Sequence, residues 1–266
     1  MNWWGKIIGG TFGFMLGGPL GALFGAVLGH NFDLGLRGTA GAGPADWGRQ
    51  ERVQTAFFTA TFSLMGHLCK VDGRVSEDEI AIARQVMDRM DLNAAQRRAA
   101  MDLFTAGKQD NFPVNEVLQQ LGLEIGRNPS LRRMFIEIQL YAAYADGVLH
   151  QAEKQVLQRI CDALDISQFE FAALTAAIGG GAYQRRGAGG PAQPAGLSVH
   201  DAYTVLNLSS AATDAEVKKA YRRLMNQHHP DKLVSKGLPE EMIKIATQRT
   251  QEIRQAYEKI KEARNF

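Results

Sequence analysis

The side chains best suited to chemistry in this sequence stand in one short run near its C-terminal end, His228-His229-Pro230-Asp231-Lys232. Two adjacent histidines could bind zinc, but a zinc site needs further ligands, and no additional cysteine or acidic ligand stands nearby at a ligand spacing. We therefore expect no zinc enzyme. We interpret the run as an exposed loop, because proline disfavours helical geometry in the residue before it.

The two cysteines, Cys69 and Cys161, offer no alternative chemistry. They are too few for a disulfide framework or a four-thiolate zinc site. Their neighbours are apolar, and they do not occupy matching places in the internal repeat described below. We expect both to be buried structural thiols.

Four carboxylates form a second set of candidate ligands, because Asp72 is followed by Glu79 at the same spacing at which Asp146 is followed by Glu153. Each aspartate precedes a glycine, and Asp-Gly is a favoured way to leave a helix, while glutamate suits the first turn of the next one. If the four converge, a divalent cation could bind between them, although hard cations usually need more oxygen ligands. We favour the turn-and-cap interpretation and keep the metal site as its alternative.

The elements that must position these carboxylates are helices. Between residues 50 and 178 the apolar residues recur with helical periodicity, and no convincing strand pattern stands out. Helix-start signals occur at Ser76 to Glu79, at Asn93, at Asn128 before Pro129, and at Ser167 to Glu170. Because residues 71–75 and 145–149 are alike, the sequence predicts an all-α domain built from two related helical hairpins.

The N-terminal segment is predicted to span a membrane. Residues 7–29 carry no charged side chain, and a helix of that length reaches about 35 Å, enough to cross a hydrocarbon core of roughly 30 Å. Polar residues including Asp33 separate this run from a possible cleavage site, so we expect the span to be retained. Arg37, Arg49 and Arg52 follow the span, which predicts a cytoplasmic C-terminal side and a short periplasmic N-terminus.

A glycine ladder runs through the predicted span, with glycine at every fourth position from Gly5 to Gly29. Spacing of four keeps these residues on one helix face, where another backbone can approach closely in lipid. Glycine is common in membrane helices, but an unbroken ladder is harder to dismiss. We expect self-association through Gly9, Gly13, Gly17, Gly21 and Gly25.

The C-terminal third is predicted to be a helical hairpin behind a tether. Residues 179–197 are rich in glycine and proline and cannot assemble an apolar face, so we expect a flexible linker. Beyond it the pattern predicts a short helix over 202–206, a longer one from Asp214, and a second long helix over about 239–261. In the last helix we expect an inward-facing stripe made of Met242, Ile245, Ile253, Tyr257 and Ile260.

The first long helix of this hairpin carries four cations, Lys218, Lys219, Arg222 and Arg223, which we call the basic face. A run of this kind is most often only solvated. The formal net charge of the chain is +2, which argues against a whole-chain polyanion binder. The interspersed Glu216 and the lack of stacking aromatics argue against nucleic acid as the partner.

Four motifs of the last segment stand in the order and spacing of a DnaJ-type J-domain: DAYTVLNL at 201–208, VKKAYRRL at 217–224, HPD at 229–231 and IRQAY at 253–257. The segment resembles a J-domain throughout. The duplicated middle resembles the TerB-like domain, whose paired acidic turns are suspected of binding metal. The resemblance gives an anchor at 1–30, a TerB-like domain at 50–178, a linker at 179–197 and a J-domain at 198–266, the order found in membrane-anchored DnaJ-like co-chaperones.

This resemblance implies a single-pass protein of the bacterial inner membrane that docks on an ATP-bound DnaK-class chaperone and accelerates its ATP hydrolysis. The chemistry would take place in the partner, so this chain would be no enzyme and would have neither catalytic residues nor a cofactor. In the family the aspartate of the tripeptide pairs with a chaperone arginine, and that role falls to Asp231. Pro230 would fix the loop, His229 would orient it, and the basic face would attract an acidic surface.

Two features limit this expectation. The chain lacks the Gly/Phe-rich segment and the paired CxxC zinc repeats of longer DnaJ proteins, so the resemblance does not imply independent holding of unfolded clients. The alternative function is an envelope signalling or ion-sensing scaffold organised by the TerB-like domain, with chaperone recruitment as its output.

Overall fold

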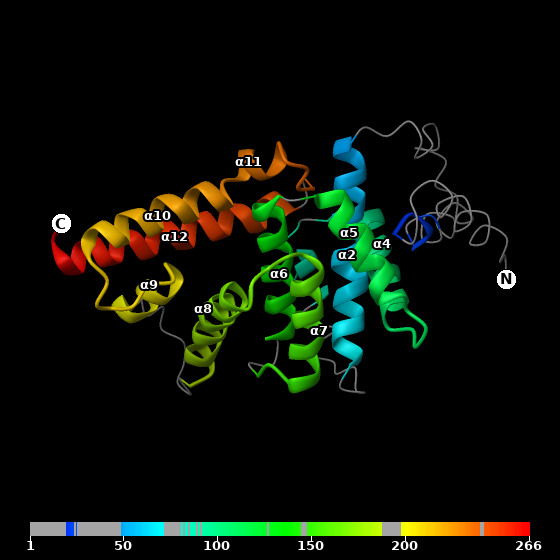
Figure 1. Cartoon of the computed structure of the whole chain (residues 1–266), viewed down its shortest axis with the longest axis horizontal. Coiled ribbons are helices and arrows are strands. Elements are labelled where there is room, and N and C mark those ends of the chain that lie inside the picture. The colour runs from blue at the N-terminus through cyan, green and yellow to red at the C-terminus, as the bar shows by residue number, and fades with distance from the viewer. Residues whose placement is uncertain are drawn as a thin grey trace.

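The computed structural model describes residues 20–23, 25, 49–71, 81, 83–84, 86–88, 90, 92–126, 128–144, 148–187, 198–239 and 242–266 (Figure 1). Every regular element within them is a helix, which confirms the predicted all-α class. The central bundle consists of α2 (Arg49–Lys70), α4 (Ala94–Gly107), α5 (Val114–Ile125), α6 (Pro129–Ala143), α7 (Gln151–Ala163) and α8 (Gln168–Gly187). The C-terminal module consists of α9 (Val199–Val205), α10 (Asp214–His228), α11 (Pro230–Val234) and α12 (Ile243–Arg264).

Helices α2 and α6 form the centre of the bundle and are buried on almost every side. Phe57 and Phe135 meet edge to face, with ring centroids 5.4 Å apart. Two hydrogen bonds lie in this interior: the Thr61 hydroxyl donates to the Phe57 carbonyl at 2.7 Å, and Gln139 Nε2 donates to the Thr61 carbonyl at 3.0 Å. Apolar packing and these hydrogen bonds hold the two helices together, although Thr59 Oγ1, Arg133 Nη2 and Gln139 Oε1 are buried without a hydrogen-bond partner among the described residues.

Two glycines let α2 and α4 pack backbone to backbone. A Cβ atom at Gly66 would collide with the Phe104 carbonyl, and one at Gly107 would collide with the Ser63 carbonyl. The close approach fixes α4 along α2 without intervening side chains.

Helix caps explain where several helices begin. The Asn93 side chain accepts from the amides of Ala95 and Gln96 at 3.0 and 2.9 Å, and Gln96 Oε1 accepts from the Asn93 amide. Asn128 caps α6 in front of Pro129, as predicted. The Ser167 hydroxyl accepts from the Glu170 amide at 3.2 Å. The capping signal at Ser76 to Glu79 lies outside the described residues.

Helix α8 contradicts part of the predicted linker, because it continues to Gly187 and so includes the glycine run that begins at residue 179. Gly179 lies against Tyr144, where a Cβ atom would stand 2.8 Å from the phenol oxygen. Glycine here permits a close contact within a packed helix instead of breaking it. Residues 188–197 of the predicted linker lie outside the described residues.

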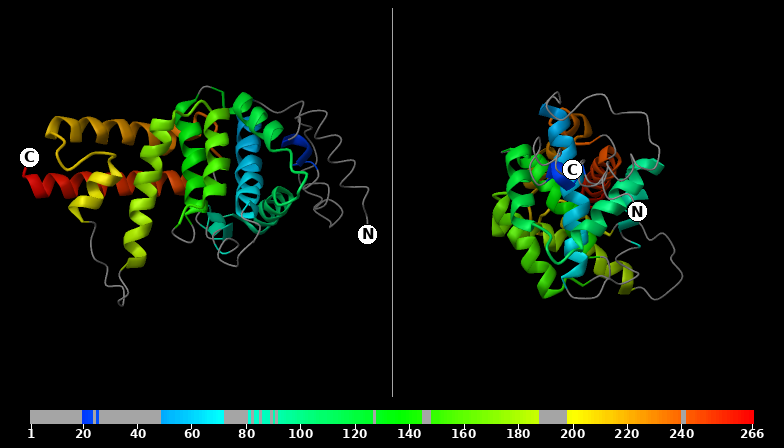
Figure 2. Two further views of the ribbon diagram at one scale, coloured as in Figure 1. Left: turned by 60° about the horizontal axis from the view of Figure 1, so that its bottom comes forward. Right: turned by 90° about the vertical axis from the view of Figure 1, so that its right-hand side faces the viewer.

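The C-terminal module is a long hairpin of α10 and α12 with α9 packed across α12 (Figure 2). Its helices run across the direction of α2, α6 and α7. Its own core contains Ala202, Tyr203, Leu206, Val217, Leu224, Ile253, Ala256 and Ile260. Arg264 closes the far end of the hairpin by donating to the carbonyls of Ser210 and Ala212 at 2.8 and 2.6 Å.

The predicted inward stripe of the last helix is divided between two cores. Ile253 and Ile260 face the core of the module, and Tyr257 packs against it. Met242 instead belongs to the core of the central bundle, and Ile245 packs against that core. The helix also begins at Ile243, later than the predicted residue 239, and α9 ends at Val205, one residue earlier than predicted.

Candidate functional site

The His-Pro-Asp tripeptide stands at a junction between two helices and not in a loop. His229 ends α10 in an extended conformation, with φ −61° and ψ 122°, and Pro230 is the first residue of the short helix α11. The expected effect of proline on the residue before it is present, but the chain then turns helical again because proline is well suited to a first helical position. The loop prediction is therefore wrong at His228, which is the buried last residue of α10, and from residue 230 onward, and only His229 lies between helices.

The tripeptide presents its aspartate to solvent. The side chain of Asp231 is 92% exposed and that of His229 is 46% exposed, with His229 Nδ1 4.0 Å from Asp231 Oδ2. Within α11, the amide of Ser235 donates to the Asp231 carbonyl at 3.0 Å, which holds the aspartate's backbone in place. A carboxylate fixed by its backbone and free at its side chain is suited to pairing with a cation on another molecule.

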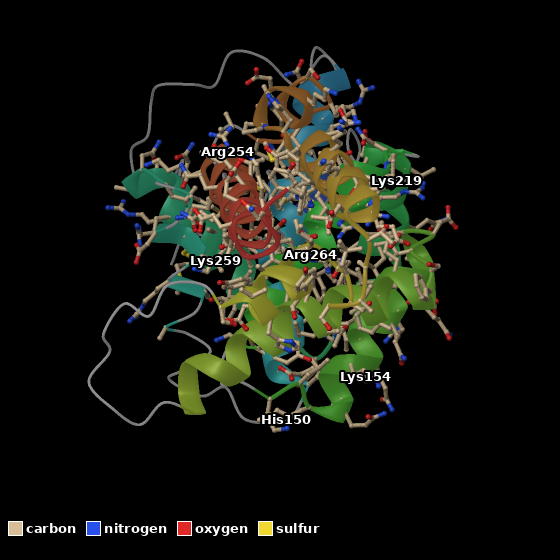
Figure 3. The ribbon with its side chains drawn as sticks, turned by 90° about the vertical axis from the view of Figure 1, so that its left-hand side faces the viewer. His150, Lys154, Lys219, Arg254, Lys259 and Arg264 are labelled. Carbon is tan, nitrogen blue, oxygen red and sulfur yellow. The ribbon has the colours of Figure 1, made fainter. Side chains whose placement is uncertain are left out.

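The basic face lies exposed along α10, one to three turns before the tripeptide. Lys218 Nζ stands 4.8 Å from the centroid of the Phe266 ring, so it also makes a cation–π contact. Figure 3 shows Lys219 on α10 on one side of the hairpin and Arg254 and Lys259 of α12 on the other. Lys219 is thus separated by the hairpin from these two cations of α12.

Asn226 and Lys232 lie between the basic face and the tripeptide, and neither was predicted to have a role. The Lys232 ammonium, next to Asp231, donates to the Asn226 side chain. Asn226 stands four residues after Arg222 and three after Arg223, so it shares their side of α10. That spacing is the signal that would have identified it.

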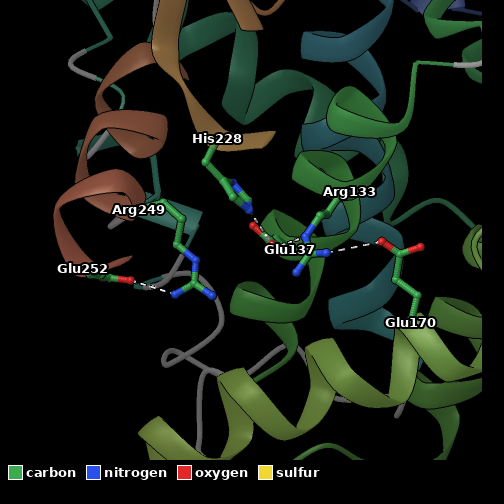
Figure 4. Close-up of polar contacts among 6 residues, drawn as sticks. All are labelled: Arg133, Glu137, Glu170, His228, Arg249 and Glu252. Atoms are coloured by element: carbon green, nitrogen blue, oxygen red, sulfur yellow. Dashed lines mark hydrogen bonds and ion pairs between the residues drawn. The ribbon is translucent and has the colours of Figure 1, made fainter. Parts of the chain in front are cut away.

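Directly before the tripeptide, His228 is buried where α10 meets the central bundle (Figure 4). Its Nε2 atom lies 3.7 Å from Glu137 Oε1, and Glu137 also accepts from Arg133 Nε at 3.0 Å. We call the set Arg133, Glu137, Glu170, His228, Arg249 and Glu252 the interface charge cluster. It joins α6 and α8 of the bundle to α10 and α12 of the module.

Burial dominates the electrostatics of this cluster. Burial lowers the pKa of His228 to about 4. The charge of Glu137 opposes this shift, whereas the charges of Arg249 and Arg133 add to it. The imidazole is therefore neutral at pH 7. Burial also opposes ionisation of Glu137, but the nearby guanidinium groups of Arg249 and Arg133 hold the pKa of that carboxyl below its ordinary value. Glu137 is therefore a buried carboxylate compensated by arginines from two helices.

The candidate metal ligands are not brought together in the part of the chain that the structure describes. Asp72, Glu79 and Asp146 lie outside it. Glu153 is buried as the third residue of α7, and its Oε2 accepts from the His150 amide at 2.8 Å, which is the helix-cap role. No group of three or more His, Cys, Asp or Glu side chains within the described residues could hold a metal ion.

The cysteines lie in the bundle core, with Cys69 and Cys161 both buried. Burial raises the pKa of the Cys161 thiol to about 12, so it stays protonated at neutral pH. A protonated, buried thiol is unreactive, in keeping with the structural role predicted for it.

The membrane prediction falls almost wholly outside the described residues. Of the predicted dimerisation glycines, Gly9, Gly13 and Gly17 lie outside them, and Gly21 and Gly25 are helical. No helix among the residues described is both long and apolar enough to cross a bilayer. Leu20 is buried against the central bundle, where its amide donates to Gln120 Oε1 at 2.7 Å.

Three family models match the chain in the predicted order. The co-chaperone DjlA transmembrane domain matches residues 1–42, the tellurite resistance protein TerB matches residues 58–176, and the DnaJ domain matches residues 201–265. Together with the tripeptide and its exposed aspartate at the end of a helical hairpin, these matches define a membrane-anchored J-domain protein.

Comparison with full-length relatives identifies the family within this class. The chain is 46% identical to the co-chaperone protein DjlA of Coxiella burnetii, over the whole of both chains. It is 43% identical to the DjlA protein of Photobacterium profundum, over 99% of each chain, and 44% identical to that of Escherichia coli O157:H7, over the whole of both. No solved structure matches the chain. The chain belongs to the DjlA co-chaperone family.

Proposed function

We propose that this protein stimulates the ATPase of a DnaK-class chaperone through its C-terminal module. The observation that carries the proposal is the exposed Asp231 carboxylate at the start of α11, in the same module as the exposed basic face of α10. The bond cleaved is in the partner's ATP, so this chain acts as a regulator and not as an enzyme.

The two parts of the site act at different ranges. The basic face attracts an acidic surface of the chaperone and raises the rate of encounter. Asp231 then pairs with a chaperone arginine, and this pair gains strength when the contact excludes water. Pro230 and the extended His229 fix where the carboxylate points.

Single-turnover ATP hydrolysis by the chaperone tests this function. Asp231→Asn removes the charge without changing the shape of the side chain, and it should abolish stimulation while leaving the helical content of the protein unchanged. His229→Gln should do the same. Glu258→Gln is the matched control, because Glu258 is a half-exposed carboxylate of the same module on α12. Full stimulation by Asp231→Asn would contradict the proposal.

We further propose that residues 1–30 anchor the protein with its C-terminal domains in the cytoplasm. Support comes from the uncharged run at 7–29 and from the arginines that follow it. On insertion Leu20 must leave its contact with the central bundle. Protease digestion of the module in sealed inner-membrane vesicles of defined orientation tests the topology: cleavage only from the cytoplasmic face is expected.

The glycine ladder supports self-association of the anchor. Replacing Gly13, Gly17 and Gly21 with leucine should preserve insertion, because leucine is favourable in lipid, and should weaken pairing by holding the backbones apart. Crosslinking in membranes measures the dimer fraction. An unchanged fraction in the variant would remove the ladder as the interface.

A further inference from the structure

The two ends of the C-terminal module are stabilised by different cores. At the far end, α9, α10 and α12 enclose the module's own core. At the tripeptide end, Leu233, Leu238, Met242 and Ala246 are completely buried, but they belong to the core of the central bundle. Apolar side chains of α11 and early α12 therefore depend on the bundle for their burial.

The segment between α11 and α12 is seated on the bundle by close contacts. Gly237 has φ +97°, and a Cβ atom there would stand 2.6 Å from Val53 Cγ1 on α2. Gln50 Nε2 donates to the Val234 carbonyl at 3.5 Å, and Lys236 Nζ donates to Ser130 Oγ at 3.4 Å. We call these three contacts the seat, and they join the segment between α11 and α12 to α2 and to the start of α6.

The interface charge cluster anchors the chain on the other side of the tripeptide. His228 is 1% exposed and faces Glu137 and Arg133 of α6 and Arg249 of α12, while Glu170 of α8 and Glu252 of α12 pair with the two arginines. His228 directly precedes the tripeptide, and Leu233 comes two residues after it. Buried anchors on the central bundle thus lie on both sides of the tripeptide.

The seat leaves the functional surface open. Asp231 is 92% exposed, and all four residues of the basic face are exposed, while the module is docked through its opposite side. The contact with the bundle therefore does not block the tripeptide. It fixes the backbone on both sides of it.

We propose that the central bundle is a positioning element for the His-Pro-Asp tripeptide, acting through the Val53–Gly237 contact and the Glu137–His228 contact. This inference rests on the function proposed above. If the seat is lost, the tripeptide samples several arrangements, and only a fraction of molecules is competent to bind the chaperone at any time. A lower competent fraction weakens apparent affinity in proportion and leaves the maximal effect intact.

Gly237→Val in the full chain, reconstituted in vesicles, breaks the seat by a clash with Val53. We expect the concentration for half-maximal ATPase stimulation to rise by about tenfold with an unchanged maximum, as for a tenfold lower competent fraction. Asp231→Asn, in contrast, should abolish ATPase stimulation even at saturating concentration. Val53→Ala makes the seat looser from the bundle side without touching the module, and should shift the half-maximal concentration in the same direction by a smaller factor.

Gly126→Val is the matched control, because Gly126 also has a positive φ, +58°, but a Cβ atom there has open space around it. It places the same side chain at a glycine with positive φ without touching the seat. Its half-maximal concentration should equal that of the wild type.

Amide hydrogen exchange supplies a readout that does not depend on the chaperone. The amides of Leu233, Ser235 and Leu238 are bonded within the α11 segment, and they should exchange at least about tenfold faster in Gly237→Val. Cysteines placed at Gln50 and Val234 and joined by a flexible bismaleimide should restore both the exchange rates and the half-maximal concentration of the Gly237→Val protein.

The outcomes separate the two proposals. Unchanged exchange in Gly237→Val, or faster exchange with unchanged half-maximal stimulation, overturns the positioning role. Absence of stimulation by the wild-type protein overturns the proposed function instead, and the exchange measurement still reports whether the bundle fixes the segment.

Discussion

Helices α6 and α10 each have 15 residues, but their surroundings are opposite. Nearly every residue of α6 is buried, including the ionised side chains Arg133 and Glu137. In α10 only Val217, Ala220, Leu224 and His228 are buried, and cations occupy the exposed side. One helix is a structural support, and the other presents a surface to a partner.

The same contrast separates two neighbouring histidines. His228 is 1% exposed and stays neutral against the bundle, whereas the next residue, His229, has a side chain that is 46% exposed. Across this one peptide bond a side chain packed on the bundle is followed by a side chain that is half-exposed. Changes at the buried residues of either helix should affect folding, and changes at the exposed cations of α10 should affect only partner binding.

The largest expected effect on stability is at Phe135. Phe135→Ala removes a fully buried ring that packs against Phe57, and should lower the free energy of unfolding by about 3–5 kcal/mol. Phe169→Ala is the matched control, because that ring is 85% exposed and its loss should change stability by less than about 0.5 kcal/mol. Urea unfolding followed by circular dichroism measures both. A similar loss in the free energy of unfolding for the two variants would contradict the difference between buried and exposed positions.

Acid should destabilise the protein through His228. Its pKa is about 4 in the folded state and 6.5 in the unfolded state, so the unfolded chain binds more protons between these values. The stability contributed by neutral His228 is complete above pH 6.5 and is lost as the pH falls, by at most about 1.4 kcal/mol per pH unit. Thermal melts at pH 7.5 and 5.0 should show a larger difference for the wild type than for His228→Gln. Equal differences would mean that another group causes the loss.

Charge reversal on the basic face should have a smaller effect, confined to association. Arg222→Glu should slow binding to the chaperone by about tenfold at low salt, with a smaller defect at high salt, because screening weakens steering. Arg254→Glu, on the other side of the hairpin in Figure 3, is the control and should change the rate less. Stopped-flow association at two salt concentrations measures this. A defect independent of salt would contradict the steering role.

Metal should have the smallest effect, because we favour the helix-cap role for Asp72, Glu79, Asp146 and Glu153. Calcium, magnesium or a chelator should leave the melting midpoint of the protein unchanged in calorimetry. A calcium-dependent rise that disappears in the Asp72→Asn, Asp146→Asn double variant would instead establish a cation site. That result would favour the ion-sensing scaffold as the function.

The helix starts, helix caps and short motifs that the sequence predicts correctly depend on local signals. Helix α10 begins at Asp214, as the sequence predicts, and the caps at Asn93 and Asn128 follow from side chains that reach amides only two or three residues away. The tripeptide and the basic face were also visible as short motifs. In each case the physical cause lies within one turn of the residue concerned.

The features that the sequence does not predict depend on residues that are distant in the chain. From the sequence alone, Glu137 is expected to be a surface residue. In the structure it is buried because Arg249, from another part of the chain, lies near it and compensates its charge. Met242 and Ile253 lie in one apolar stripe, and nothing local indicates that they enter different cores. Gly179 reads as a helix breaker until Tyr144 is known to pack against it.

The seat between Gln50 and Val234 joins residues 184 positions apart in the chain. Contacts of such high sequence separation form late, because the entropy of closing the loop must be overcome first. During synthesis the central bundle leaves the ribosome before the C-terminal module and can fold first. The His-Pro-Asp tripeptide therefore reaches its final geometry only at the end of folding, so that newly made chains acquire their recruiting surface after the support for it is complete.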